Sequence, residues 1–436
     1  MKVRPFPHAR ALSALAVMLL LAACSGGGNA VPGHPTSAGL GPTQSQTFTV
    51  ARAGPAARVC SEASVGYATC DAWRRLDVGQ AGLMRHDQPH TTPSPLASAA
   101  SGGCVNPSSG YTPCDLWAAY NLNPAGGGFG QTIAVVDAFD DPNAESDLAV
   151  YRNQFGLPAC TTANGCFRKL NQNGVQGNYA GADTGWSQEI SLDLDMASAI
   201  CPNCRLLLVE GNSNAFSDLA AAVNAAVAAG AAIVSNSYSG TETAGLVAAY
   251  GPAYDHPGVL MTVASGDGGF GGPRFPDDLN TVVSVGGTTL HSIRPRSESA
   301  WSGAGSGCSA VASSLTAQPS WQRADNRIRH ACSNRAYADV SADADPNTGV
   351  DAYDSFNMGG WLVFGGTSVG SPLIAGVFAL AGNASSAGPS YPYAHSQALN
   401  DVSGGSNGNC GSDLCVSKKR WDGPTGLGSP NGTGAF

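Results

Sequence analysis

The chain has 436 residues, enough for one large domain or two ordinary ones. Only 12% of its residues are charged, 43% are hydrophobic and 57 are glycine, which indicates a globular chain rich in turns and excludes a disordered one. The net charge is −9 and there is no basic run, so nucleic acid is not an expected partner. The low charge also suits work in acid, because few carboxylates would have to be protonated there.

The first 23 residues have the features of an export signal. Three basic residues precede the apolar run 11–23, which is too short to span a bilayer with these flanks. The sequence Leu-Ala-Ala-Cys that ends at Cys24 resembles a bacterial lipobox, in which the cysteine is lipidated after cleavage. We therefore expect Cys24 to carry a lipid that anchors the chain to a membrane. The alternative is an ordinary secretory signal, with Cys24 incidental.

The cysteines support export. There are 13, an odd number, and setting Cys24 aside leaves twelve in sequence-local pairs, as suits short disulfide loops in an oxidising compartment. The sequence leaves their connectivity open, and a redox or zinc motif is an alternative for Cys201-Pro-Asn-Cys204. The pairs are Cys60 with Cys70, Cys104 with Cys114, Cys160 with Cys166, Cys201 with Cys204, Cys308 with Cys332, and Cys410 with Cys415.

Residues 24–103 differ in composition from the rest of the chain. Their first part, to about residue 58, is rich in Gly, Pro, Ser, Thr and Ala and indicates a flexible tether. A weak repeat follows, in which the segment 60–73 is echoed at 104–117. We interpret the first copy and the polar segment after it as a short pro-region or stalk. The second copy opens the main domain, 104–436, and the signal occupies 1–23.

From residue 130 onward, predicted strands alternate with predicted helices. This alternation implies an α/β fold with a mostly parallel sheet and helices on both faces. In such sheets the site lies at the carboxyl ends of the strands, and Asp137, Asp267 and Ser368 all follow apolar runs at such ends. The predicted strands are 132–136, 205–209, 231–235 and 259–264, and the predicted helices are 142–154, 186–200, 216–229 and 243–254.

The stretch from Trp361 to Gly376 predicts a buried strand, a sharp turn at two glycines and a tightly packed helix. Pro372 would lie in the first turn of that helix, where N–H groups have no intrahelical partner. Ser368 would lie at the helix N-terminus, where N–H groups and the helix dipole favour negative charge. A nucleophile that passes through an oxyanion needs that setting. Alternatively, Thr367 and Ser368 only cap the helix.

Two further stretches carry acids in apolar surroundings. Glu189 and Asp193 are four residues apart, so they share one face of a helix that is apolar nearly all round. If buried there, they must share a proton or one must have a raised pKa; the alternative is an ordinary pair of surface acids. Asp267 follows a buried strand among glycines, where a protonated carboxyl can donate to an oxyanion or simply form a turn.

Together, Gly-Thr-Ser-x-x-x-Pro at 366–372, Glu-x-x-x-Asp at 189–193 and Ser-Gly-Asp at 265–267 resemble the sedolisins, the serine-carboxyl peptidases. The resemblance covers 104–436 and implies a subtilisin-like fold and an endopeptidase that acts in acid. By position it makes Ser368 the nucleophile, Glu189 its general base and acid, Asp193 the group that orients Glu189, and Asp267 the oxyanion-stabilising acid.

The resemblance extends to binding residues. Asp137 resembles a carboxylate that helps to hold Asp193, and the segment 235–240 resembles the edge along which an extended substrate lies. The residues expected to contact substrate there are Ser237, Tyr238, Ser239 and Gly240. The segment before residue 104 is much shorter than the prodomain usual in the family, so no acid-triggered zymogen is predicted.

The C-terminal region resembles the calcium site of the family, which would bind one Ca²⁺ ion. Asp401 and Asp422 would supply carboxylate oxygens and Val402 a backbone carbonyl, and oxygen ligands suit a hard cation. The family usually has glycines where this chain has Lys418 and Arg420. Their carbonyls remain available, but two cationic side chains beside the ion would weaken binding. The alternative is a pair of Asx turns that close the domain.

The sequence thus predicts a monomeric serine endopeptidase that hydrolyses polypeptides at acidic pH through an acyl-enzyme. It would be exported and lipid-anchored to the bacterial cell envelope, or secreted. One alternative is a catalytically silent surface lipoprotein that uses the same fold for binding. Another is a subtilisin-type protease with an Asp-His-Ser triad, which commonly has its histidine in His-Gly-Thr, and none of the eight histidines has that context.

Overall fold

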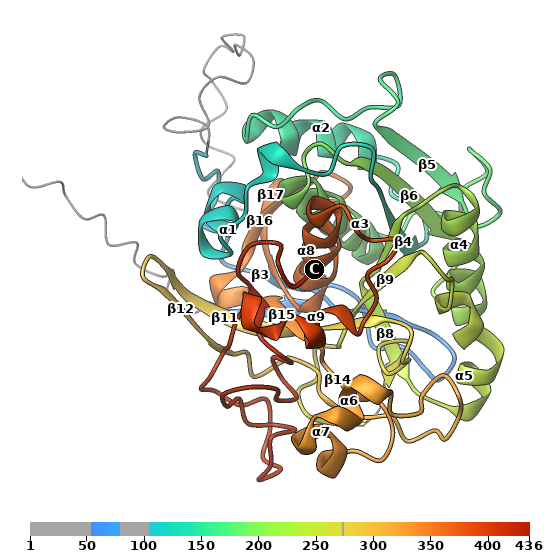
Figure 1. Ribbon diagram of the computed structural model, residues 1–436. Coiled ribbons are helices and arrows are strands. Elements are labelled where there is room, and N and C mark those ends of the chain that lie inside the picture. Colours follow the sequence, from blue (N-terminus) through green and yellow to red (C-terminus); the bar gives the residue numbers. More distant parts are fainter. Residues whose placement is uncertain (1–53, 79–103, 273) are drawn as a thin grey trace, which may run out of the picture. The chain divides into compact units, whose positions relative to one another are not determined.

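The computed structural model describes residues 54–78, 104–272 and 274–436 (Figure 1). Contacts divide the chain into residues 1–47 and 48–436, and all described residues belong to the second unit. The predicted signal at 1–23, Cys24 and most of the tether lie outside the described residues. Among the helices of the described ranges, none is both long enough and apolar enough to cross a membrane.

An eight-stranded sheet forms the centre of this unit, in the order β12-β11-β9-β7-β4-β6-β5, with β15 also paired to β11. Within it, β11 and β12 are antiparallel and the other pairings are parallel. The predicted mostly parallel sheet is confirmed. Its strands are β4 (Thr132–Ala138), β5 (Phe167–Asn171), β6 (Arg205–Gly211), β7 (Ile233–Asn236), β9 (Leu260–Ala264), β11 (Val283–Ile293), β12 (Arg296–Ala300) and β15 (Val340–Asp343).

Helices cover both faces of this sheet, as predicted. Successive side chains of a strand point to opposite faces, so Ile133 and Val135 of β4 join one hydrophobic cluster and Ala134 and Val136 join the other. Figure 1 shows α3 and α8 together near the centre, with α4 and α5 along the right-hand side. The first cluster includes α1 (Pro113–Ala119), α2 (Ala144–Gln154), α3 (Thr184–Ile200) and α8 (Thr367–Ala381), and the second includes α4 (Phe216–Ala228) and α5 (Ala244–Tyr250).

The predicted elements agree with these bounds to within two residues, with one exception. The helix predicted at 243–254 ends at Tyr250 and continues as a 3₁₀ turn, η3 (Gly251–Tyr254). Pro252 explains the break, because proline has no N–H to continue the helical bonds and its ring clashes with the preceding turn.

The strand before Ser368 does not belong to the parallel sheet. It is β17 (Gly360–Gly365), in an antiparallel sheet of order β1-β3-β17-β16 with β1 (Ala56–Arg58), β3 (Trp73–Arg75) and β16 (Val350–Asp354). The expectation that Ser368 follows a strand of the parallel sheet is therefore wrong. A short apolar run is compatible with a buried strand of either kind, so the sequence pattern could not distinguish them.

Residues 54–78, which the sequence assigned to a pro-region or stalk, thus share a sheet with the main domain. They also supply β2 (Thr69–Cys70), which joins β8 (Tyr238–Thr241) and β10 (Arg274–Phe275) in a three-stranded sheet of order β10-β8-β2. The boundary at residue 103 stays a prediction. The remaining elements are β13 (Gly307–Cys308), β14 (Ala336–Tyr337), β18 (Leu399–Asn400), β19 (Ser429–Pro430), α6 (Ser320–Ala324), α7 (Asn326–Ala331), α9 (Tyr391–Ala394), η2 (Pro124–Gly126), η4 (Pro346–Thr348) and η5 (Ser396–Ala398).

All six expected cysteine pairs form disulfides. Cys201 and Cys204 are among them, so the alternative of a zinc motif there is not what the structure contains. The bonds are Cys60–Cys70, Cys104–Cys114, Cys160–Cys166, Cys201–Cys204, Cys308–Cys332 and Cys410–Cys415.

Candidate active site

Ser368 is the second residue of α8 and is fully buried. The helix starts directly after β17 because Gly366, its N-cap, adopts φ 100°, a conformation that residues with a side chain rarely take. Gly366 makes no side-chain cap, and the hydroxyl of Thr367 bonds to Asp267 instead. The predicted position of Ser368 at a helix N-terminus is confirmed, and the alternative that these hydroxyls only cap the helix is contradicted.

Pro372 lies deeper in the helix than predicted. It is the sixth residue of α8, one turn beyond the first, so the first-turn prediction is wrong. At this position proline removes the hydrogen bond that residue 372 would donate to the carbonyl of Ser368. The helix can begin as early as Thr367 because Gly366 makes the turn alone.

Glu189 and Asp193 lie on α3, and neither side chain is accessible to solvent. Asp183 caps the helix, accepting hydrogen bonds at 2.9 Å from the N–H groups of Gly185 and Trp186. The alternative of a surface acid pair is contradicted. Among the described residues, the four carboxyl oxygens have no well-formed hydrogen-bond partner. The hydroxyl of Ser368 is nonetheless close enough to Glu189 to lower its pKa slightly against the larger effects that raise it.

A third carboxyl belongs to the same cluster. Asp137, near the end of β4, is fully buried, and burial raises its pKa to about 8. Burial also raises the pKa of Glu189 well above its ordinary value, with the charges of Asp193 and Asp137 adding to the effect. The pKa of Asp193 is raised by burial and then by Asp137. Three acids in this environment cannot all be ionised, so the cluster retains protons that it can share.

Asp267 lies three residues after β9 and is 3% exposed. Its Oδ1 accepts hydrogen bonds from the N–H of Thr367 at 2.8 Å and from its hydroxyl at 2.9 Å. Its Oδ2 has no hydrogen-bond partner among the described residues and would lie 2.6 Å from a Cβ placed on Gly366. Burial and the charge of Asp71 raise the pKa of Asp267, so in acid Oδ2 can carry a proton to donate.

The segment expected to bind substrate runs beside Ser368. The carbonyl of Ser237 accepts a hydrogen bond from the Ser368 hydroxyl at 3.2 Å. Tyr238 is buried, and its hydroxyl donates to Asn236 Oδ1 at 2.9 Å. Ser239 and Gly240 continue the strand as part of β8. This strand is not a free edge, because β2 pairs with it on one side and β10 on the other.

The sequence did not predict two residues of this site, Asp71 and Arg274. Asp71 is fully buried, accepts a hydrogen bond from Ser239 at 2.5 Å and lies 3.8 Å from Arg274. The repeat did mark Asp71, since Asp115 follows Cys114 as Asp71 follows Cys70, but Asp115 only forms a capping box with Thr112. Because the two aspartates of the repeat have different structural roles, the repeat could not predict that Asp71 belongs to the site.

The five residues expected around calcium are close to one another. Asp401 Oδ2 accepts from the N–H of Arg420 at 2.9 Å, and Asp422 Oδ2 accepts from the N–H of Lys418 at 3.0 Å. The ammonium of Lys418 pairs instead with Asp413 at 2.7 Å, and the Val402 carbonyl accepts from Ser417.

This donor set fits a hard cation, provided that carbonyls supply part of the shell. Burial raises the pKa of Asp422 to about 7, and a cation would favour its charged form. Within residues 54–78, 104–272 and 274–436 there is no group of three or more His, Cys, Asp or Glu side chains that could hold a metal ion. The ligands that this loop could provide to a cation are therefore the carboxylates of Asp401 and Asp422 and backbone carbonyl oxygens.

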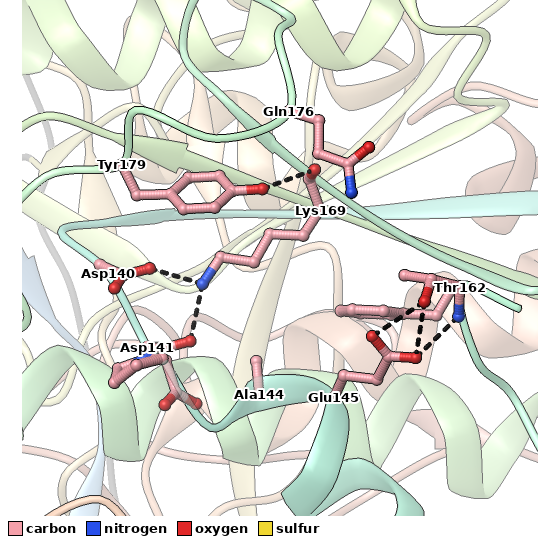
Figure 2. A pocket seen from close by; sticks show the side chains of 10 residues that line it. Asp140, Asp141, Ala144, Glu145, Thr162, Lys169, Gln176 and Tyr179 are labelled. Carbon is pink, nitrogen blue, oxygen red and sulfur yellow. Dashed lines mark hydrogen bonds and ion pairs between the residues drawn. The ribbon is translucent and has the colours of Figure 1, made fainter.

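A hollow of about 340 Å³ lies beside α2 and β5, and none of the predicted catalytic residues lines it. Figure 2 shows Lys169 directed at Asp140 and at the backbone of Asp141, 2.5 and 2.7 Å away. Lys169 also pairs with Glu210 at 2.9 Å. Its charge is therefore already neutralised, which leaves little attraction for an anionic ligand. The Thr162 hydroxyl on the other side of the hollow donates to Glu145 at 3.0 Å.

Comparisons with known proteins agree with this geometry. The model of the subtilase family (Peptidase_S8) matches residues 175–399. Kumamolisin of Bacillus sp. (strain MN-32) is 28% identical over 345 residues, covering 72% of this chain and 61% of kumamolisin. Sedolisin of Pseudomonas sp. (strain 101) is 30% identical over 184 residues, 37% of this chain and 30% of sedolisin. The chain thus spans less than two thirds of these relatives.

A solved structure of Pseudomonas sedolisin, a serine-carboxyl proteinase in complex with pseudo-iodotyrostatin, has the same fold. Its TM-score is 0.63 at 24% identity, and the match covers 74% of this chain and 95% of that one. The family match includes α3, β9 and the strand and first turn around Ser368. The chain belongs to the subtilase family, and it is similar to kumamolisin and sedolisin.

Proposed function

We propose that the protein is a serine-type endopeptidase in which carboxyl groups, and not an imidazole, handle the proton of the nucleophile. One observation carries the proposal: Ser368 lies at a helix N-terminus beside the buried carboxyl of Glu189, and the buried carboxyl of Asp267 accepts a hydrogen bond from the N–H of the preceding residue, Thr367. The similarity to kumamolisin and sedolisin supports the same reaction class.

In the proposed mechanism the hydroxyl of Ser368 attacks the carbonyl carbon of a peptide bond while Glu189 accepts its proton. Asp193 and Asp137 make Glu189 a stronger base by raising its pKa. Glu189 then returns the proton to the departing amine, and water hydrolyses the acyl-enzyme by the reverse sequence. The N–H of Ser368 and the protonated Oδ2 of Asp267 stabilise the oxyanion.

This chemistry requires acid. Asp267 can donate only while protonated, and the donor is lost as pH rises through its raised pKa. Glu189 must meanwhile be able to accept a proton from Ser368. It cannot do so at a pH so low that Glu189, Asp193 and Asp137 are all protonated. We therefore expect a bell-shaped pH dependence with its maximum in acid.

The decisive experiment compares wild type with Ser368→Ala on a denatured protein substrate at about pH 4, where Asp267 is protonated. Cleavage by the wild type alone is expected, together with an intact-mass species that carries an acyl group on Ser368. Cleavage by both proteins, or by neither, contradicts the proposal.

Two alternatives have less support. A silent binding protein gains nothing from three buried carboxyls that have no well-formed hydrogen-bond partner within the described residues, because burying such groups costs stability. For an Asp-His-Ser triad, the histidines of the described ranges are in the wrong places. His256, His291 and His395 bond to Asn224, Ser299 and Tyr391, and His330 is exposed.

We also propose one calcium ion held by Asp401, Asp422 and the carbonyls of Val402, Lys418 and Arg420. When bound, it would cross-link the loop and stabilise the fold. We propose that the protein is exported and carries a lipid on Cys24, because its N-terminus resembles a signal sequence. We further propose that it acts on polypeptides as a monomer. Six formed disulfides agree with an oxidising compartment.

A further inference from the structure

A peptide carbonyl of the chain lies at the nucleophile and marks where a substrate carbonyl would lie. The carbonyl oxygen of Asp71 accepts a hydrogen bond from the N–H of Ser368 at 3.0 Å. A Cβ placed on Gly366 would lie 2.2 Å from this oxygen and 2.6 Å from Asp267 Oδ2. The carbonyl is thus close to both proposed oxyanion donors. The surroundings of the Asp71 side chain therefore show which side chains fit directly before a cleaved bond.

The backbone around Asp71 also follows the path expected of a substrate. The strand before it, β2, pairs antiparallel with β8, and the N–H of Asp71 donates to the Ser237 carbonyl at 3.1 Å. Pairing of an extended segment with a strand edge is a common way to bind a polypeptide. A substrate that takes this path would place one side chain where that of Asp71 lies.

Ser239 and Arg274 contact the carboxyl of Asp71, and we call these two residues the acid subsite. Ser239 donates to Oδ2 at 2.5 Å, and the guanidinium of Arg274 lies 3.8 Å from Oδ1. Nε of Arg274 donates to the hydroxyl of Ser239 at 2.8 Å. Because a hydroxyl has a single proton, this bond directs the proton of Ser239 at the carboxyl. The acid subsite thus presents a donor and a positive charge to the side chain that lies there.

The backbone around the acid subsite holds Arg274 in place. Its strand, β10, pairs with β8, the strand of Ser239. Its side chain packs against Gly266, where a Cβ would lie 2.6 Å from Nε and 2.7 Å from Cδ. Gly266 directly precedes Asp267, so the guanidinium is positioned against the loop that carries the proposed oxyanion acid.

The charges around the acid subsite favour an acidic side chain in acid. Burial raises the pKa values of Asp277 and Asp267 well above the ordinary range, so in acid neither offsets the charge of Arg274. Burial also raises the pKa of Asp71, against the opposing effects of Arg274, Ser239 and Arg58. An acidic side chain can therefore be buried here in acid at low cost, whereas a lysine would keep its charge. The titratable groups that face Arg274 are Asp71, Asp277, Tyr337 and Asp267.

We propose that the protein cleaves polypeptides after acidic residues, and that Arg274 and Ser239 determine this specificity. An aliphatic side chain would leave the Ser239 hydroxyl without its acceptor and would take water away from Arg274 without replacing it. A basic side chain would meet a like charge. This inference rests on the proposed function and names the substrate class of the same site.

The test uses the full-length protein at about pH 4 and three peptides that differ only in the residue before the cleaved bond, which is Asp, Leu or Lys. For wild type, kcat/KM should be at least about tenfold higher for the Asp peptide than for the Leu peptide, and lowest for the Lys peptide. In a digest of a denatured protein, the cuts should follow Asp and Glu.

Two variants test the acid subsite itself. Ser239→Ala and Arg274→Gln should each lower the ratio of kcat/KM for Asp over Leu at least about fivefold, and this ratio does not depend on how much protein folds. Arg323→Gln, which changes an exposed arginine on α6, is the matched control and should keep the wild-type ratio.

The inference and the proposed function fail in different ways. Similar rates for the three peptides with wild type, or an Asp preference that is unchanged in both variants, would overturn the inference and leave the proposed function intact. Failure to cleave both the peptides and the denatured protein would refute the proposed function instead.

Discussion

Asp267 offers the sharpest test of the oxyanion chemistry, because Asp267→Asn changes its titration with little change of shape. The amide oxygen can keep both hydrogen bonds from Thr367, at 2.8 and 2.9 Å. The amide NH₂ then replaces Oδ2, the atom that lacks a partner among the described residues and lies beside Gly366. The variant therefore keeps a donor at the oxyanion but no longer needs a proton to make it.

The expected effect depends on pH. In wild type the donor is present below the raised pKa of Asp267 and lost above it, so activity falls on the alkaline side. In Asp267→Asn that loss should disappear, and activity in acid should stay within about tenfold of wild type. Asp267→Ala removes the donor altogether and should lower kcat by about 10²–10³-fold, or ~2.7–4 kcal/mol.

The assay is kcat from about pH 3 to pH 8 on a fluorogenic peptide, with Tm measured at each pH to exclude unfolding. Asp255→Asn, which removes an exposed carboxylate outside the site, is the matched control and should follow wild type. An unchanged alkaline limb in Asp267→Asn would show that another group titrates there and would refute the assignment of Asp267 as the donor.

Three further predictions follow from the same structure. Glu189→Gln should lower kcat by about 10²–10⁴-fold while Tm is retained, and normal kcat would exclude Glu189 as the base. The Tm of the wild type should fall as the pH rises from about 4 to about 8, because the Asp137 carboxyl has a raised pKa in the folded protein and stabilises the fold only while protonated. Asp137→Asn should make this fall of Tm smaller, which differential scanning calorimetry can measure. Chelation of calcium should lower Tm by a few degrees in wild type but not in Asp401→Asn, and equal shifts in both would place the ion elsewhere.

Much of this protein could be predicted from local sequence. The alternation of apolar runs with helical stretches predicted the parallel sheet because a strand and a helix each need a characteristic spacing of apolar residues. Glu189 and Asp193 could be placed on one face of a buried helix because helical periodicity is a local property. Ser368 was placed at a helix N-terminus because the glycines before it allow an abrupt turn.

Only the tertiary structure decided what lies around these residues. Asp71 is almost 300 positions from Ser368, and nothing near it in the sequence shows that its carbonyl meets the N–H of that serine. The membership of β17 in an antiparallel sheet, and the approach of Arg274 to Asp71, likewise depend on strands that pair across long stretches of chain. Spacing along the chain records how a segment folds on itself, whereas partners brought together by pairing of distant strands leave no periodic trace in either segment.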